Sequence, residues 1–281
     1  MSTKLADRLS VVVPSATLAI NARAQELRAK GIDIISFGAG EPDFDTPTNI
    51  REAGIAAIEA GRTRYTAVSG IAELRAAIAE RSTRERGVAA TAANVVVTVG
   101  AKGALFNLAL ALFEPGDEVI IPAPYWVSYP EQVRLVGATP VFIPSTLERG
   151  WKLDPADLAR ALTPKTKAVV LCSPSNPTGA AYGPAELEAI AAVLRAHDCW
   201  IVLDEIYGSL VYDGFDQRSL VSVAPDLAPR AVIIDGVSKT YAMTGWRVGW
   251  MIGPSDVMKA CLLYTSPSPR DRTRSRMPSS A

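Results

Sequence analysis

The sequence predicts an α/β protein with a mainly parallel central sheet between helices. Three observations lead to this prediction: apolar runs recur along residues 95–252, helical segments lie between several of them, and several runs do not alternate apolar with polar residues. Continuous apolar runs are typical of strands covered on both faces. Strands that alternate with helices imply parallel pairing with right-handed crossovers, so functional loops are expected at the carboxyl ends of the strands.

Short apolar runs are predicted as the strands of this sheet. They are Val95–Val99, Glu118–Pro122, Thr139–Ile143, Ala168–Cys172, Trp200–Leu203, Ala231–Ile234 and Val248–Ile252. The segments predicted as helices are Ser15–Lys30, Gly103–Phe113, Trp126–Leu135 and Pro184–His197.

The composition is that of an ordinary globular protein. The 281 residues are 48% hydrophobic, which is enough for a substantial core. Lysine plus arginine and aspartate plus glutamate each number 29, so the balanced charge does not indicate affinity for nucleic acids or membranes. The longest apolar stretch, Ala104–Phe113, is shorter than the roughly 20 residues that cross a bilayer. Small molecules and further copies of the chain are the expected partners.

The N-terminus, the cysteines and the histidine narrow the location and the chemistry. Met1–Asp7 lacks the pattern of a secretory signal, so a cytoplasmic location is expected. Cys172, Cys199 and Cys261 are far apart and odd in number, and we interpret them as buried thiols. Because His197 is the single histidine, the chain has neither a Ser-His-Asp constellation nor a histidine-rich metal site. A lysine therefore becomes the candidate for the general base.

Two ionisable residues follow predicted strands. Lys239 comes shortly after Ala231–Ile234, and Asp204 comes directly after Trp200–Leu203. Open α/β sheets bind ligands at the carboxyl ends of their strands. A carboxylate there needs a cation or a hydrogen-bond donor, or its pKa rises. The alternatives are a solvated surface lysine, and a helix cap or buried ion pair for the aspartate. Tyr207 is expected near the same place.

Three other connections carry groups that suit a ligand. Asn176 lies in a loop between prolines, which favours one directed hydrogen bond. Residues 100–103 join a strand to an apolar helix whose first amides form a site for an anion such as phosphate. Trp126 follows Glu118–Ile121 and has a flat ring suited to stacking on a heteroaromatic ligand, with core packing as the alternative.

Three more residues are candidates for contact with a ligand, two glycines near the N-terminus and an arginine before the last predicted strand. Gly38 and Gly40 allow a backbone to approach a ligand closely, and a plain turn is the alternative. Arg247 stands just before Val248–Ile252 and offers phosphate a bidentate partner, unless it is an ordinary surface arginine.

Together these residues provide what pyridoxal phosphate requires of a protein. They supply an amine for its aldehyde, a carboxylate for its ring nitrogen, donors for its phenolic oxygen, a stacking ring and a phosphate cradle. The carboxylate keeps the ring nitrogen protonated, so that the ring accepts electrons from a carbanion. The lysine forms a Schiff base and afterwards moves a proton.

Six motifs also occur in order between Lys4 and Ala260. They are residues 39–47, Tyr65-Thr66 with Gly70, Gly100-Ala101-Lys102, Asn176-Pro177-Thr178-Gly179, Asp204-Glu205-Ile206-Tyr207, and Ser238-Lys239 through Gly245-Trp246-Arg247 and Gly249. On these motifs the chain resembles the class I aminotransferases of pyridoxal-phosphate fold type I, and among them the bacterial aspartate aminotransferases.

The resemblance implies a role for each matched residue. Lys239, Asp204 and Tyr207 would be catalytic, with Lys239 as the Schiff-base lysine, Asp204 on the pyridine nitrogen, and Asn176 with Tyr207 on the ring oxygen. The full set implied for cofactor binding is Tyr65 from a second subunit, Gly100, Ala101, Lys102, Trp126, Asn176, Asp204, Tyr207, Ser238, Lys239 and Arg247. The residues implied for substrate binding are Gly40, Trp126 and Asn176. A shared site implies a homodimer.

The resemblance divides the chain into three parts. Residues 1–47 would form an arm and part of a small domain, and residues 48–260 the domain that binds pyridoxal phosphate. Residues 261–281 do not resemble the family and have the composition of a disordered tail. In the family the chain continues into a small domain with an arginine for the substrate α-carboxylate. No such residue is found here, so a truncation joined to foreign sequence is expected, with apolar surface exposed on the small-domain part.

The implied activity is transfer of the amino group of aspartate to 2-oxoglutarate, which forms oxaloacetate and glutamate. Some relatives that also use prephenate have a lysine and an arginine in place of Val13 and Ile32, so aspartate is the expected substrate. One alternative is a class I aminotransferase or lyase for aromatic, sulfur-containing or prephenate-type substrates. Another is an inactive fragment that only binds the cofactor. A third, a regulator fused to a DNA-binding domain, is disfavoured because no winged-helix segment precedes Pro14.

Overall fold

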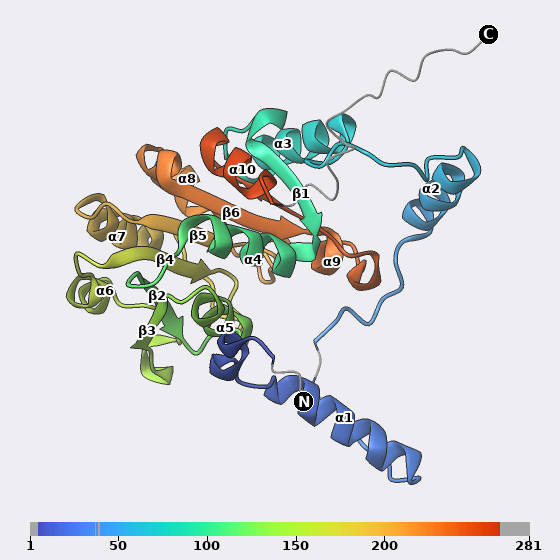
Figure 1. The fold of residues 1–281 in the computed structure, drawn as a ribbon, viewed down its shortest axis with the longest axis horizontal. Helices are drawn as coiled ribbons and strands as arrows, with labels where there is room; N and C mark the ends of the chain where they lie inside the picture. The colour runs from blue at the N-terminus through green and yellow to red at the C-terminus, as the bar shows by residue number, and fades with distance from the viewer. Residues whose placement is uncertain (1–4, 37, 39, 265–281) are drawn as a thin grey trace.

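A seven-stranded sheet forms the centre of the molecule (Figure 1). The computed structural model describes residues 5–36, 38 and 40–264. The strands are β1 (Val95–Val99), β2 (Glu118–Ala123), β3 (Thr139–Pro144), β4 (Thr166–Cys172), β5 (Trp200–Asp204), β6 (Ala231–Gly236) and β7 (Val248–Ile252). Every predicted strand is confirmed, with ends that differ by one or two residues at most.

The strand order is β1-β7-β6-β5-β4-β2-β3, and the prediction of a mainly parallel sheet is confirmed. β7 is the exception, because it runs antiparallel to both β1 and β6. The connection from β6 to β7 is residues 237–247. A parallel return needs a crossover of about a dozen residues or more, and this connection is occupied by short helical turns instead. Lys239 and Arg247 therefore lie in the same short connection, which follows the carboxyl end of β6.

Helices cover both faces of the sheet, and two further helices lie away from it (Figure 1). The helices of the described residues are α1 (Ala16–Ala29), α2 (Thr48–Glu59), α3 (Ala72–Arg86), α4 (Gly100–Leu112), α5 (Ser128–Leu135), α6 (Pro155–Ala161), α7 (Pro184–Arg195), α8 (Leu220–Val223), α9 (Val237–Thr240) and α10 (Ser255–Leu262). The four predicted helices correspond to α1, α4, α5 and α7. α4 begins three residues before its predicted start, so residues 100–102 form its first turn.

Alternate residues of each central strand pack into two separate apolar clusters. On β5, Ile201 and Leu203 pack with residues of α3, α6, α7 and α8. Val202 points to the other face and packs with residues of α4, α5 and α10. Side chains alternate across a strand with a period of two, so a strand buried on both faces must be apolar at every position. This is why the strands appear in the sequence as continuous apolar runs.

α1 and α2 stand apart from the sheet (Figure 1). α2 has no buried residue, and Ile55 and Ile58 on it are 56% and 67% exposed. In the part of the chain that the structure describes, no helix is both long enough and apolar enough to span a membrane. Ala39 and residues 265–281 of the predicted disordered tail lie outside the described residues. The first two residues of that tail are instead helical, because Cys261 at the end of α10 is buried in the apolar cluster on the α4 side of the sheet. The division into three parts otherwise stays a prediction.

Gly249 is required by the close approach of β7 to the start of α4. A Cβ atom at Gly249 would lie 2.3 Å from the backbone nitrogen of Ala101 and 2.4 Å from the carbonyl carbon of Gly100. We expect Gly249→Ala to lower the free energy of unfolding by about 3 kcal/mol, the upper end for overpacking, because backbone atoms cannot turn aside. Gly245→Ala is the control, since nothing lies within 4 Å of a Cβ there. Equal urea-unfolding midpoints for the two variants would contradict this expectation.

Candidate active site

The predicted site residues meet where β4, β5 and β6 end. Asp204 is the last residue of β5, Lys239 lies in α9 directly after β6, and Asn176 lies in the loop after β4. Because these strands are adjacent and parallel, their carboxyl ends share one edge. The Tyr207 hydroxyl accepts a hydrogen bond from the Asn176 amide at 3.5 Å, and the Lys239 amine lies 5.6 Å from the centre of the Tyr207 ring. The structure thus brings these four residues together.

Asp204 is a buried carboxyl group with uncharged donors. It is 3% exposed, and its oxygens accept hydrogen bonds from the Tyr129 hydroxyl at 2.6 Å and from the backbone N–H of Ile206 at 3.3 Å. Burial raises the pKa of Asp204 to about 6, although the two hydrogen bonds oppose the rise. A cationic hydrogen-bond donor beside Asp204 would therefore stabilise its ionised form.

Tyr129 is a site residue that the sequence analysis missed. It lies in α5, and its ring meets the Trp126 ring edge-on, with centres 5.4 Å apart. Burial and the neighbouring Asp204 keep the pKa of the phenol well above its usual value, so the hydroxyl remains a donor to the carboxylate. A tyrosine one helical turn after Trp126 was the available signal, but only the crossing of α5 over the sheet aims it at β5.

The amine of Lys239 is partly withdrawn from water. Its Nζ donates to the carbonyl oxygen of Gly40 at 2.5 Å. Burial lowers the pKa of Lys239, and the nearby Glu41 carboxylate acts in the opposite direction. A lowered pKa increases the fraction of neutral amine, which is the form that acts as a nucleophile or a base.

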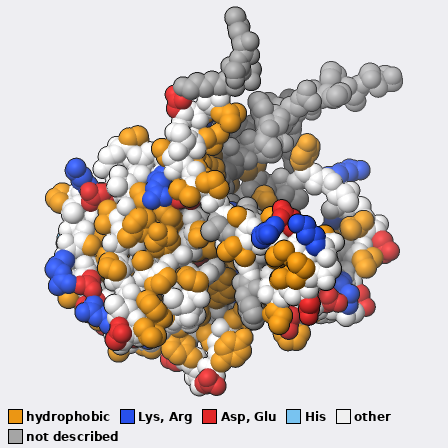
Figure 2. Space-filling model, turned by 90° about the horizontal axis from the view of Figure 1, so that it is seen from below, with side chains coloured by type: hydrophobic (Ala, Val, Ile, Leu, Met, Phe, Trp, Pro, Cys, Tyr) orange, Lys and Arg blue, Asp and Glu red, His pale blue; other side chains and the backbone are white. Residues whose placement is uncertain are grey.

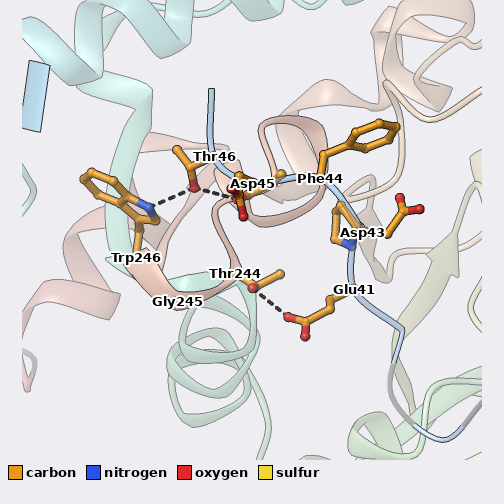
Figure 3. Close-up of a pocket in the computed structure, with 10 residues that line it drawn as sticks. Glu41, Asp43, Phe44, Asp45, Thr46, Thr244, Gly245 and Trp246 are labelled. Atoms are coloured by element: carbon orange, nitrogen blue, oxygen red, sulfur yellow. Dashed lines mark hydrogen bonds between the residues drawn. The ribbon is translucent and has the colours of Figure 1, made fainter. Parts of the chain in front are cut away.

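Hydrogen bonds fasten the segment that contains Gly40 to the turn that contains Lys239 (Figure 3). The Thr46 hydroxyl donates to the Ala242 carbonyl at 2.7 Å and accepts from the Trp246 indole at 3.1 Å. The Thr244 hydroxyl donates to the Glu41 carboxylate at 3.0 Å. Residues 41–46, 242 and 244–246 line an open pocket of about 920 Å³, and neither Lys239 nor Asp204 is in its wall. These hydrogen bonds hold the segment of residues 40–46 beside Lys239, although the two are far apart in sequence.

The start of α4 and Arg247 form the predicted phosphate cradle. Gly100 is buried with φ +72°, and a Cβ there would lie 2.5 Å from the Arg247 guanidinium. Glycine therefore lets the guanidinium lie against the first turn of α4, which contains Ala101 and Lys102. The Lys102 amine also lies 5.0 Å from the centre of the Trp126 ring. Ser238 is placed in α9, one residue before Lys239.

Tyr65 is not brought to the other site residues within one chain. It lies between α2 and α3 and is 92% exposed. The prediction that it reaches the site of a second subunit is therefore still a prediction. The interpretation of the cysteines holds for Cys199 and Cys261, which are buried, whereas Cys172 is partly exposed beside Asp204 in the sheet.

The sequence matches a family model described as aminotransferase class I and II over residues 32–268. It is 52% identical over 257 residues to the aspartate/prephenate aminotransferase of Cereibacter sphaeroides, a match that covers 91% of this chain and 64% of that protein. It is 49% identical to the aspartate aminotransferase of Geobacillus stearothermophilus, with 92% and 65% covered. The chain thus spans less than two thirds of the length of these relatives.

The fold is also similar to a solved structure with the same kind of activity in its name. The aspartate aminotransferase from Thermus thermophilus with maleate superposes with a TM-score of 0.91 at 46% sequence identity. The match covers 95% of this chain and 69% of that one.

The raised pKa of Asp204 predicts a pH-dependent stability of the cofactor-free chain. Because its pKa rises from 3.8 to about 6 on folding, the protonated carboxyl favours folding below pH 4, and this contribution is lost as the pH rises to 6. At about 1.4 kcal/mol per unit, Asp204→Asn should be more stable than the natural chain by about 3 kcal/mol at pH 8. The difference should vanish towards pH 4. Urea unfolding across this range measures it.

The control is Asp216→Asn, which changes an exposed aspartate paired with Arg218 at 2.8 Å. Its effect should stay below about 1 kcal/mol, as for other surface pairs. If Asp204→Asn is destabilising at pH 8, the burial of an ionised Asp204 is not the dominant cost.

Proposed function

The chain belongs to the class I and II aminotransferases, and on this premise we propose that it forms the cofactor-binding part of an aspartate aminotransferase. Enzymes of this family use pyridoxal 5'-phosphate. We propose that the whole protein transfers the amino group of aspartate to 2-oxoglutarate in two successive half-reactions. The observation that carries the proposal is the meeting of Lys239, Asp204, Asn176 and Tyr207 at one edge of the sheet.

The residues present fit this cofactor. Asp204 is buried and receives hydrogen bonds from uncharged donors, and a protonated pyridine nitrogen would give it a cationic one. Gly100 leaves room for Arg247 beside the first turn of α4, where free backbone amides and a guanidinium both favour phosphate. Ala101, Lys102 and Ser238 complete the proposed phosphate site.

Each of the chain's own groups has a separate task in this proposal. When bound, the cofactor supplies an electron-withdrawing ring that stabilises negative charge at the substrate α-carbon. Asp204 holds a proton on the ring nitrogen, and Tyr129 keeps the carboxylate in place. The Lys239 amine, with its lowered pKa, would accept the proton that leaves the substrate α-carbon and deliver it to a carbon of the cofactor. Lysine is thus the base in a chain whose one histidine lies elsewhere.

Three side chains would orient the ring and the substrate. Asn176 and Tyr207, already in contact, would donate to the ring oxygen. Trp126 would pack on the face of the cofactor ring. The indole of Trp126 is itself in contact with the Tyr129 ring and with the Lys102 amine. Gly40, whose carbonyl now accepts from Lys239, would also face the substrate.

We propose that the whole protein is a homodimer with shared sites. Figure 2 shows hydrophobic side chains over much of one face, together with side chains of both charges rather than a basic stripe. Exposed apolar residues on α1 and α2, including Ile20, Ile55 and Ile58, and the exposed Tyr65 suit contact with a second copy. A cofactor-bound protein that sediments as a monomer would refute this. A cytoplasmic location is also still a prediction.

The choice of amino donor is the finer part of the proposal. The Geobacillus relative is named for aspartate alone, whereas the Cereibacter relative is named for aspartate and prephenate. Val13 and Ile32 are uncharged and 62% and 47% exposed, which favours aspartate. We expect the whole protein to use aspartate with 2-oxoglutarate faster than glutamate with prephenate. Comparing kcat/KM for the two pairs tests this, and the reverse order would favour the prephenate-type alternative.

The assignment of Lys239 can be tested in the 281-residue chain itself. We expect incubation with pyridoxal phosphate, borohydride reduction and peptide mass spectrometry to find the cofactor attached to Lys239. Lys239→Ala should lose this adduct because the other lysine of the proposed site, Lys102, is assigned to the phosphate rather than to the aldehyde. Lys165→Ala, at an exposed lysine, should keep it. Labelling spread evenly over surface lysines in the natural chain would rule out the proposed cofactor site.

A further inference from the structure

A buried cluster of charges lies on the sheet face opposite to the Asp204 side chain. The Arg86 guanidinium, at the end of α3, contacts the Glu205 carboxylate at 2.8 Å and the Asp235 carboxylate at 2.8 Å. The three residues are 8%, 4% and 3% exposed. Neither Arg86 nor Asp235 belongs to the family motifs or to the proposed cofactor contacts.

The cluster is directly linked to the site through the backbone. Asp204 and Glu205 are consecutive, so they point to opposite faces: Asp204 towards Tyr129 of α5, and Glu205 towards α3. Asp235 is near the end of β6, four residues before Lys239. The backbone N–H of Glu205 donates to the Ile234 carbonyl at 2.9 Å, which joins the two strand ends. One guanidinium therefore contacts both the residue next to Asp204 and a residue in the strand that leads to Lys239.

Arg81, one turn earlier on α3, extends the same contact. Its guanidinium lies 3.6 Å from the Asp235 carboxylate, donates to the Ser209 hydroxyl at 2.8 Å, and lies 5.6 Å from the centre of the Tyr241 ring. Asp235 and Tyr241 lie on either side of Lys239 in sequence. α3 thus contacts the chain both before Lys239, at Asp235, and after it, at Tyr241.

The Arg86 side chain is closely packed and buried. A Cβ at Gly208 would lie 2.8 Å from the guanidinium, so the chain after Tyr207 passes directly over it. Burying three charges is costly, and apolar side chains of the same volume would often stabilise a protein as well. Nη1 of Arg86 donates to the Glu205 carboxylate, whereas Nη2 makes a close ion pair with Asp235 without hydrogen-bond geometry. A rigid guanidinium that contacts two carboxylates through separate nitrogens limits their relative position, which apolar packing does not.

We propose that Arg86 is a positioning residue of the cofactor site, which sets the separation of Asp204 from Lys239 by holding the carboxylates of Glu205 and Asp235. The proposal rests on the proposed function. Its physical basis is that a carboxyl and an amine acting on one rigid ring must keep a fixed spacing, and small displacements of such groups cost much of their effect.

The test is Arg86→Lys in the 281-residue chain. Lysine keeps the charge but cannot bridge two carboxylates with a planar fork. We expect the Kd for pyridoxal phosphate to rise by about 10-fold. We also expect the absorbance of the lysine-linked cofactor to titrate with a midpoint shifted by more than about half a pH unit, because a changed distance alters the interaction between the charges.

Two variants control for general destabilisation. Arg84→Lys changes an exposed arginine on the same helix that pairs with Glu80. Ile190→Val removes one buried methyl group from α7 and costs about 1 kcal/mol. Both should leave the Kd and the titration midpoint unchanged. If Arg86→Lys lowers stability but leaves both cofactor readouts at the values of these controls, its role is structural only and the proposal is overturned.

Glu205→Gln keeps the proposal testable if Arg86→Lys does not fold. It leaves Asp235 on Arg86 and removes the ionic contact beside Asp204, so the Kd and the midpoint should move in the same direction as for Arg86→Lys; unchanged values overturn the proposal. Absence of any Lys239-dependent adduct in the natural chain refutes the proposed function, whereas a normal adduct with unaltered readouts in both variants refutes only the role of Arg86.

Discussion

The burial of β5 and β6 on both faces is the constraint on which the site depends. Within these strands, alternate apolar residues belong to different clusters, and this alternation continues past the last apolar residue. Asp204 therefore emerges on the face of α4 and α5, and Glu205 on the face of α3. Each carboxylate then meets the partner that its own face offers: a phenol for the first and a guanidinium for the second. A shift of pairing by one residue would exchange the two environments.

The short return from β6 to β7 is the second determinant of the site. It makes β7 antiparallel and leaves Lys239, Thr244 and Arg247 on one turn. Gly249 then lets β7 lie against the first turn of α4, which brings the arginine to the amides of residues 100–102. The amine and the phosphate cradle are consequently parts of one packed unit, and the segment of residues 41–46 is hydrogen-bonded onto it.

The buried carboxyl group of Asp204 lowers the stability of the cofactor-free fold at neutral pH. Burial raises its pKa to about 6, so the cofactor-free chain carries an ionised carboxylate in an unfavourable place at neutral pH. A ligand that supplies a positive charge there removes this cost, and the released free energy contributes to binding. The lowered pKa of Lys239 follows the same logic, since burial disfavours its charged form. Groups held in environments that suit the ligand better than water are typical of prearranged sites.

The sequence by itself determined the strands and the strand-end residues Asp204, Asn176 and Lys239, because two-sided burial and parallel pairing leave a direct pattern of apolar runs followed by polar residues. It did not reveal α3 or Arg86, since this arginine ends a run of charged residues that is typical of a solvated helix. Only the tertiary structure places the end of α3 against β5 and β6, where Arg86 is buried between the carboxylates of Glu205 and Asp235. Tyr129 was decided in the same way, because its role depends on where α5 crosses the sheet and not on its sequence neighbours.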